Sequence, residues 1–572
     1  MKKTPQRKAD PIAAELIRNS LVAATEEMKS VLMRTSYNMI IYEALDFTVG
    51  LFDRHGQTLS IGLGLPMFIR GMSDVVKAKL AHWGEENIHP GDILLTNDAY
   101  TTGAHLNHLT FSIPVFHKGR IVAFSTCMAH WQDIGSILNG VTTDIYAEGL
   151  QIPLVKYHQR GVLNEEMREL ILMTVRRRDR AAGDLEAQLS ACRVGVKHIE
   201  EMLSRHGEAT WQAALDAIMD HTEAEARAMV KRMPDGVYEA ESFMDDDAVD
   251  IDQPVPIRVK VIVKGDSMTV DLSRMSPQVK GFFNSGAGVA CAQVAFKCLT
   301  LPTDHPINDG NFRPLKVILP KGTVVSALHP APMRVWMTYP MTLVDTIFKA
   351  LSQAIPESVI AGHHADLVIA NVNGFHPRDG KLWIYLGGLI GGGWGAKHNE
   401  DGVNVTVCMN DGDTHNGPSE QVENKFPLLV RYYRLREDSG GAGQFRGGLG
   451  AEAEVVALSK VNYQTRIDRV NHPPWGLQGG HSAMGNRVGM RKKDGTLTLY
   501  SSGKVNMRLD AGEAYVLHSG GGGGFGDPKK RDKDAVRRDL RLGYISQETA
   551  RKVYGVKTAT SPSGDQKSKR TS

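Results

Sequence analysis

The feature that most restricts the fold is a long proline-free stretch between two strand-like parts of the chain. Residues 154–233 contain no proline and are rich in Ala, Leu, Glu, Arg and Met, which favour helices. Three or four helices are expected there. On both sides, short apolar runs and Gly-containing turns predict strands. Because strands and helices do not alternate regularly, the pattern favours an α+β chain over a parallel α/β sheet.

The length of 572 residues is too great for one hydrophobic core, so about three or four domains are expected. We expect a multi-domain chain with several β-rich units and a helical insertion. The predicted parts are an N-terminal helix (1–35), a β-rich domain with a metal site (36–153), a helical segment (154–235), an α+β domain (236–379), a Gly-rich β domain (380–530), C-terminal helices (531–556) and a disordered tail (557–572).

Composition excludes several classes of protein. The net charge is +3 and no aromatic-basic stripe is present, so we expect no nucleic-acid binding. The apolar runs fall short of the ~20 residues that span a bilayer, and no apolar segment follows the charged N-terminus, so we expect no membrane contact and no signal peptide. The five cysteines include no Cys-x-x-Cys, which indicates a reducing, cytoplasmic location.

Two histidines stand three residues apart in "NDAYTTGAHLNHLTFSIPVF" (97–116), just before a run that predicts a strand. In a helix, His105 and His108 would share a face and both rings could reach one metal ion. In an extended chain they would point to opposite faces, unless a turn lies between them. Gly103 permits such a turn.

A hairpin predicted over 108–131 returns a third histidine to the same place. A two-residue turn at Lys118–Gly119 would set His130 opposite Asn107. A longer turn or a β-bulge would shift the register and set it opposite His108. The second arrangement is the one in which both rings can share an ion.

Three histidines and a carboxylate would suit zinc or manganese, with one position open for water. Asp98 and Asp133 are nearby alternative ligands, and Cys127 is another, although it fits a strand core better. The competing interpretation is that the three histidines are half-buried polar residues at loop ends. His363 and His364 form a poorer ligand pair, because adjacent residues of an extended chain diverge.

Glycine clusters in the segments 387–396, 439–452 and 519–527. The first could bind an anion through backbone amides, or its glycines could serve tight β corners. Neither a P-loop nor a well-placed Gly-x-Gly-x-x-Gly is present, so no nucleotide site is predicted. The chain also lacks Gly-x-Ser-x-Gly and His-Glu-x-x-His, which disfavours a serine hydrolase and a zincin.

A series of blocks resembles the hydantoinase B/oxoprolinase family over residues 10–555. They include "NDAYTTGAHLNHLTFSIPVF", "AHWQDIGS", "GDLEAQLSACRVG", "DGVNVTVCMNDGDTHNGPSEQVENKFPL" and "SGGGGGFGDP". The resemblance implies one subunit of an ATP-dependent hetero-oligomer. A separate hydantoinase A-like ATPase subunit would bind ATP and phosphorylate a carbonyl oxygen of a small-molecule substrate. The B-like subunit would complete the reaction at a centre with a divalent metal.

The resemblance also implies a ligand set, carried over block by block. It consists of Asp46 in "DFT", His105 and His108 in "AHLNH", and His130 in "AHW". The chain departs from the family pattern at two of these blocks. His108 replaces the usual aspartate, which favours zinc or manganese over harder ions. Trp131 replaces the second histidine of the frequent Ala-His-His, and a large apolar ring beside the metal would suit an apolar substrate.

We therefore expect the metal-dependent subunit of an ATP-dependent hydrolase of cyclic amides such as hydantoins, 5-oxoproline or lactams. Asp133 is the candidate to take a proton or to orient His130, and Glu148 is a second candidate for that work. A ketone carboxylase of the acetone or acetophenone type is the alternative. A non-catalytic scaffold whose site has decayed at His108 is a third.

Overall fold

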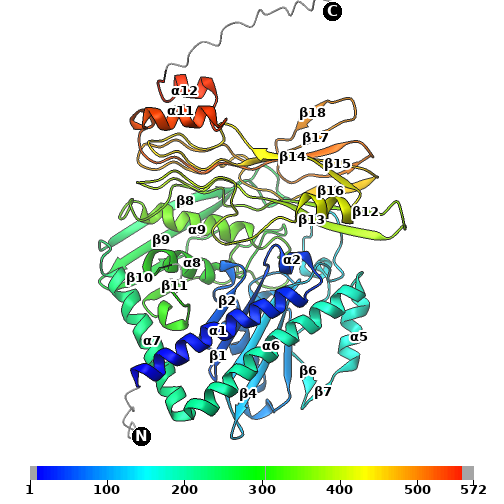
Figure 1. Ribbon diagram of the computed structural model, residues 1–572, viewed down its shortest axis with the longest axis vertical. Coiled ribbons are helices and arrows are strands. Elements are labelled where there is room, and N and C mark those ends of the chain that lie inside the picture. The colour runs from blue at the N-terminus through cyan, green and yellow to red at the C-terminus, as the bar shows by residue number, and fades with distance from the viewer. Residues whose placement is uncertain (1–9, 303–304, 557–572) are drawn as a thin grey trace, which may run out of the picture.

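The computed structural model describes residues 10–302 and 305–556 (Figure 1). Four sheets and a set of long helices make up this part of the chain, which confirms the predicted α+β, multi-domain architecture. The predicted tail, 557–572, lies outside the described residues. No helix in 10–302 or 305–556 is long and apolar enough to cross a bilayer.

The first sheet is a seven-stranded antiparallel sheet with the order β2-β1-β5-β4-β3-β6-β7. Its strands are β1 (Phe47–Asp53), β2 (Thr58–Leu63), β3 (Ile93–Thr96), β4 (His108–His117), β5 (Arg120–His130), β6 (Val155–Gln159) and β7 (Val162–Leu163). Successive residues of β5 enter two different cores: Cys127 and Ala129 pack on one face, whereas Phe124 and Met128 pack on the other. The sheet is therefore buried on both faces.

Long helices cover one face of this sheet, as Figure 1 shows for α1 and α6. The helices of this part are α1 (Pro11–Thr35), α2 (Met39–Tyr42), α3 (Gly71–Trp83), α4 (Ala99–Thr102), α5 (Glu165–Thr174), α6 (Arg178–His206) and α7 (Glu208–Val230), with the 3-10 turns η1 (Pro66–Phe68), η2 (Glu85–Asn87) and η3 (Ile145–Glu148). Asp10 caps α1, accepting a hydrogen bond from the Ile12 amide at 3.1 Å, and Pro11 is its first residue.

The start of the predicted helical segment was wrong. Residues 155–163 form β6 and β7, and the helices begin at α5. Lys156 and His158 alternate with Val155 and Tyr157, a period of two that fits a strand. Pairing with β3 therefore prevails over the helix-favouring composition of the longer window.

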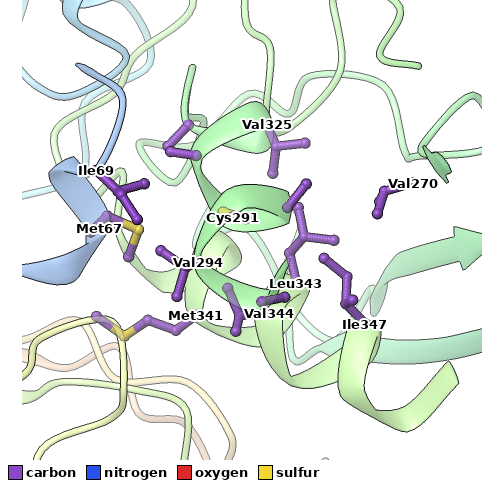
Figure 2. Close-up of a cluster of buried hydrophobic side chains, with 14 of the residues drawn as sticks. Met67, Ile69, Val270, Cys291, Val294, Val325, Met341, Leu343, Val344 and Ile347 are labelled. Atoms are coloured by element: carbon purple, nitrogen blue, oxygen red, sulfur yellow. The ribbon is translucent and has the colours of Figure 1, made fainter. Parts of the chain in front are cut away.

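The middle of the chain forms a second sheet in the order β11-β10-β9-β8. Its elements are β8 (Gly236–Met244), β9 (Val255–Lys264), β10 (Ser267–Asp271), α8 (Gly288–Thr300), η4 (Asp309–Phe312), β11 (Leu315–Ile318) and α9 (Thr338–Leu351). Helix α9 packs on β8 and β9, and α8 packs on α9. Figure 2 shows Met67 and Ile69, from and just after η1, reaching this cluster beside Val294. The first two units thus share a core.

Two further antiparallel sheets form the last part of the chain, with the orders β13-β12-β16-β19 and β14-β15-β20-β17-β18. Their strands are β12 (Val368–Phe375), β13 (Leu382–Ile390), β14 (Leu428–Leu435), β15 (Ala451–Ala457), β16 (Val461–Thr465), β17 (Arg487–Arg491), β18 (Leu497–Leu499), β19 (Asn506–Leu509) and β20 (Ala514–His518). The hairpin of β12 and β13 spans the boundary predicted at 379/380. The short helices α10 (Ser419–Lys425), η5 (Pro528–Lys530), α11 (Lys533–Arg541) and α12 (Gln547–Lys552) complete it.

Parts of the glycine clusters belong to strands, at 387–390 in β13 and 451–452 in β15, and their remaining segments lie against one another outside the named strands. Gly393 donates to the Gly520 carbonyl at 3.0 Å, and Gly522 donates to that of Gly448 at 2.9 Å. A Cβ on Gly393 would stand 1.9 Å from the Gly448 oxygen, so only glycine allows this approach. These amides already have carbonyl partners, so they do not form the anion-binding loop considered as an alternative.

Candidate metal centre

The hairpin of β4 and β5 places His108 directly opposite His130. Next to the turn, Phe116 pairs with Ile121, which is the register of a two-residue turn. A bulge between Val115 and Phe116 then shifts the pairing by one residue for the rest of the hairpin. The bulged register, one of the two predicted from the sequence, is confirmed.

A turn carries His105 to the same place. Helix α4 ends at Gly103, which has a left-handed φ of 77°. The His108 amide then donates to the His105 carbonyl at 3.2 Å, which closes a turn over 105–108. The sequence left open whether these residues form a helix, an extended chain or a turn, and the structure shows the turn.

Asp46 joins the group from the neighbouring strand. It stands just before β1, which pairs with β5, and its carbonyl accepts from the His130 amide at 3.0 Å. Its Oδ1 lies 2.9 Å from His108 Nε2. The ring centroids are 4.6 Å apart for His105 and His108, 4.8 Å for His105 and His130, and 5.2 Å for His108 and His130. All four proposed ligands therefore form one buried cluster.

Burial decides the charge of the cluster. It lowers the pKa of His108 to about 3, and it holds the pKa of His105 and His130 well below the ordinary value. Burial also raises the pKa of Asp46 to about 6, although the charge of His130 acts in the opposite direction. At neutral pH the three imidazoles are therefore neutral, which is the state that ligates metals.

The hydrogen bonds of the cluster leave ring nitrogens without partners. His105 Nδ1 lies 3.0 Å from the Arg334 carbonyl, which can only accept, so this nitrogen carries the proton and Nε2 has the lone pair. Within the described residues, His105 Nε2, His108 Nδ1 and His130 Nδ1 are buried and have no hydrogen-bond partner. Buried unpaired nitrogens on three neighbouring rings fit a group of metal ligands.

The donor atoms do not surround a common point in this arrangement. Among residues 10–302 and 305–556, no three His, Cys, Asp or Glu side chains are placed as they would be around a metal ion. Instead, Asp46 and His108 are hydrogen-bonded directly to each other. The residue types and the unpaired nitrogens fit a metal, and holding one would require that hydrogen bond to be replaced.

Asp133, the first catalytic candidate, is held by other groups. It lies in the loop after β5, and both its oxygens accept from Arg176, one from the backbone amide and one from the guanidinium. Oδ1 also accepts from the Gly135 amide at 3.1 Å. Asp133 lines the same cavity as His130, but its hydrogen bonds link the loop to the chain that precedes α6.

Glu148, the second candidate, organises the segment that contacts His105. One carboxylate accepts from the amides of Met333 (3.1 Å and 2.9 Å) and Arg334 (3.0 Å) and from the Thr142 hydroxyl (2.7 Å). The backbone carbonyl of Arg334, in the same segment, accepts a hydrogen bond from His105 Nδ1. Glu148 therefore acts on His105 through the backbone. Burial raises the pKa of Glu148 to about 7 despite these donors.

Glu148→Gln is expected to lower stability by about 1–3 kcal/mol, because the amide cannot accept from all these donors. The pKa of Glu148 is raised from 4.5 to about 7 on folding. Its contribution is therefore complete below pH 4.5 and is lost as the pH rises through 7. Chemical denaturation at about pH 4.5–8 should show that the unfolding free energy falls less steeply with pH in the variant than in the wild type. Glu548→Gln, on the surface, is the control. Equal slopes would contradict the assignment.

The expectation that Trp131 lies beside the metal was wrong. Its side chain packs in the core under α6, and its Nε1 donates to Gln188 Oε1 at 2.9 Å. Adjacent residues of an extended chain face opposite ways, so His130 and Trp131 cannot both face the cluster. The aromatic rings beside the histidine cluster are those of Phe68 and Trp336, whose centroids lie 4.9 Å and 6.0 Å from the centroid of the His108 ring. Nothing in the sequence patterns indicated either residue.

Two cavities meet at His130. One, of about 100 Å³, is lined by Asp46, Asp411 and apolar residues of α2. The other, of about 120 Å³, is lined by His105, Arg334 and Arg466. Sequence reasoning did not single out Asp411, Arg334 or Arg466, although Asp411 stands inside one of the quoted family blocks.

Asp411 adds a second carboxyl group to the first cavity. It accepts from Cys408 Sγ at 2.6 Å. Burial raises its pKa to about 7, and the charge of Asp46 contributes to the same shift. The alternative ligand pair His363 and His364 is completely buried elsewhere, and within the described residues none of its four ring nitrogens has a partner. Cys127 is a core residue, as expected.

The comparisons with known proteins identify the family of the chain. The family model for hydantoinase B/oxoprolinase matches residues 10–528. The chain belongs to this family. The B-type subunit of a putative D-/L-hydantoinase from a Pseudomonas species (strain NS671) is 31% identical, and the match covers 97% of this chain and 96% of that protein.

Two solved structures share the fold. The ATP-dependent caprolactamase of Pseudomonas jessenii superposes with a TM-score of 0.90 at 29% identity, covering 97% of each chain. A nucleotide-free acetone carboxylase superposes with a TM-score of 0.88 at 19% identity, covering 96% of this chain and 79% of that chain. At that identity, the second likeness concerns the fold alone.

Proposed function

We propose that this chain is the metal-dependent subunit of an ATP-dependent cyclic-amide hydrolase. The observation that supports this best is the buried cluster of Asp46, His105, His108 and His130, with three unpaired ring nitrogens at the junction of two cavities, all within the described residues. The relatives named for hydantoinase and caprolactamase activity support the class of substrate. A hydantoin or a lactam is a poor electrophile, so its hydrolysis is faster once the carbonyl has been activated.

The four cluster residues would hold a divalent ion, with zinc or manganese favoured by three nitrogens and one carboxylate. Such an ion lowers the pKa of water and polarises a carbonyl. The protein's own contribution is to keep the imidazoles neutral, to fix the His105 tautomer through the Arg334 carbonyl, and to exclude bulk water with Phe68 and Trp336.

The cavity beside His105 suits a cyclic amide. Leu367, Ile369 and Leu386 supply an apolar wall for ring methylenes, and Asn107 and Gln132 can bond to polar atoms of the substrate. Asp411 is a second carboxyl group in the cavity that Asp46 lines. Its pKa of about 7 would suit it to transferring a proton.

A hydantoinase A-like ATPase is the proposed partner. The relative from strain NS671 is named as one subunit of a hydantoinase, which supports a hetero-oligomer. The proposal places ATP on that partner, which would phosphorylate the substrate carbonyl before it reaches the histidine cluster. We further propose a cytoplasmic location, where the five free cysteines stay reduced.

The proposal is tested by mixing the chain with its A-type partner and ATP. The panel contains hydantoin, 5-oxoproline, caprolactam and acetone, with and without bicarbonate. We expect ATP-dependent ring opening of one cyclic amide and no requirement for bicarbonate. Bicarbonate-dependent loss of acetone would instead establish carboxylation, which the fold of acetone carboxylase keeps as the alternative. One argument for that alternative, an apolar Trp131 at the site, no longer holds.

A further inference from the structure

Two arginines lie in the wall of the cavity next to the histidine cluster. Arg334 stands in the segment before α9, and Arg466 directly follows β16, so two different parts of the chain bring them together. His105 and His130 line the same cavity. The backbone of Arg334 is also fixed to the cluster, since its carbonyl contacts His105 Nδ1 at 3.0 Å.

Neither guanidinium is satisfied by the part of the chain that the structure describes. Arg334 Nη2 donates to the Leu138 carbonyl at 3.5 Å, and Arg466 Nη2 donates to Gln464 Oε1 at 3.0 Å. Arg334 Nη1 and Arg466 Nε are buried, and among the described residues they have no partner. Buried donors on a charged group are normally paired, because an unpaired one costs free energy.

The charges around the pair do not balance it. Arginine keeps its positive charge in proteins, so the two guanidinium groups bring two positive charges to the wall of this cavity. Glu148 is the carboxylate that acts on both, and its oxygens are occupied by amides and a hydroxyl. Arg176 and Asp133 also act on Arg334, but they are paired with each other, so together they add no net charge. The cavity therefore presents a positive field that an anion would complete.

We infer that Arg334 and Arg466 form a phosphoryl-binding subsite beside the histidine cluster. Planar guanidinium groups bind phosphate oxygens through paired hydrogen bonds. The inference rests on the proposed function for one point, which is that the phosphoryl group belongs to the activated substrate. The subsite would hold that group while the amide carbon faces the cluster.

The test uses the full-length chain without partner or ATP, so it does not depend on turnover. Inorganic phosphate is titrated with the protein and its ³¹P line width is recorded. We expect saturable broadening that weakens by at least about tenfold in Arg334→Met and in Arg466→Met. Arg313→Met is the matched control, since this arginine pairs with Asp220 and Glu223 at the surface, and its phosphate affinity should equal the wild type.

Arg466→Lys keeps the charge but loses the planar fork, so we expect an intermediate loss of affinity. If a methionine variant has a lower unfolding midpoint than the wild type, Arg466→Lys replaces it as the test variant.

A second experiment uses methyl phosphate as a competitor, because its phosphate bears one organic group, as the phosphate of the activated substrate would. Displacement of phosphate supports a substrate phosphoryl group, and failure to displace would overturn that assignment in favour of free phosphate. Unchanged affinity in both methionine variants, or no broadening with the wild type, would overturn the subsite itself. Failure of the proposed hydrolase would instead appear only in the ATP-dependent panel.

Discussion

His105→Ala is expected to lower ATP-dependent turnover in the complex by at least about a hundredfold and to reduce the bound metal below about one equivalent. The physical reason is the position of the lone pair. The Arg334 carbonyl fixes the proton on Nδ1, which leaves Nε2 buried and unpaired within the described part of the chain. Alanine removes that donor and leaves a cavity in its place. Elemental analysis and turnover are measured on the same preparation.

Two further variants make this result specific. His82→Ala removes a histidine of α3 that takes no part in the cluster, and it should leave metal content and turnover unchanged. His108→Asp introduces the aspartate that the family pattern has at this position. It also places a second carboxylate beside that of Asp46. We expect this variant to unfold at a lower temperature without added metal, and to recover with zinc or manganese, because only a cation relieves two adjacent negative charges. Full turnover of metal-free His105→Ala would support the scaffold interpretation instead.

Arg469→Met is expected to destabilise the chain by about 3–5 kcal/mol, the largest stability effect predicted for a single side chain here. Arg469 Nη2 donates to Asp345 Oδ2 at 3.0 Å, and their side chains are 3% and 1% exposed. Asp345 lies on α9, whereas Arg469 follows β16, so the pair joins the middle unit to the last one. Methionine would leave the carboxylate buried without its charge partner. Thermal unfolding monitored by circular dichroism measures the loss.

The double variant Asp345→Asn, Arg469→Met should lose less than the sum of the two single variants, since it removes both charges together. Lys552→Met is the surface control: its pair with Glu548 lies on α12, with both side chains more than half exposed. That change should alter the unfolding free energy by less than about 1 kcal/mol. Additive losses in the double variant would show that the buried pair carries no coupling.

Residue types and spacing identified the histidines of the cluster and limited their possible geometries. Histidine spacing, Gly103 and the length of the hairpin allowed a turn and a bulged register among the alternatives, and both occur. The α+β class followed from the contrast between a proline-free segment and strand-like flanks. The prediction for 155–163 failed because a long composition window concealed the short strands β6 and β7.

The direction of Trp131 shows the limit of motif reasoning. Its place in a family block suggested that the Trp131 ring lies at the site. Side chains alternate between the two faces of a strand, however, so Trp131 points into the core under α6. Phe68 and Trp336, which do contact the histidines, come from segments with no motif of their own. Their positions depend on how η1 and the segment before α9 pack across the first sheet, and packing between distant segments leaves no periodic signal in the sequence.

The sequence by itself determined the family, the fold class and the three histidines at the end of the β4–β5 hairpin, because each depends on residue types and on pairings close in the chain. Only the tertiary structure decided what surrounds them. Arg334, Arg466 and Asp411 reach the two cavities from parts of the chain more than 200 residues after His105. Their unpaired donors and shifted pKa values arise from burial, which is a property of the packed chain.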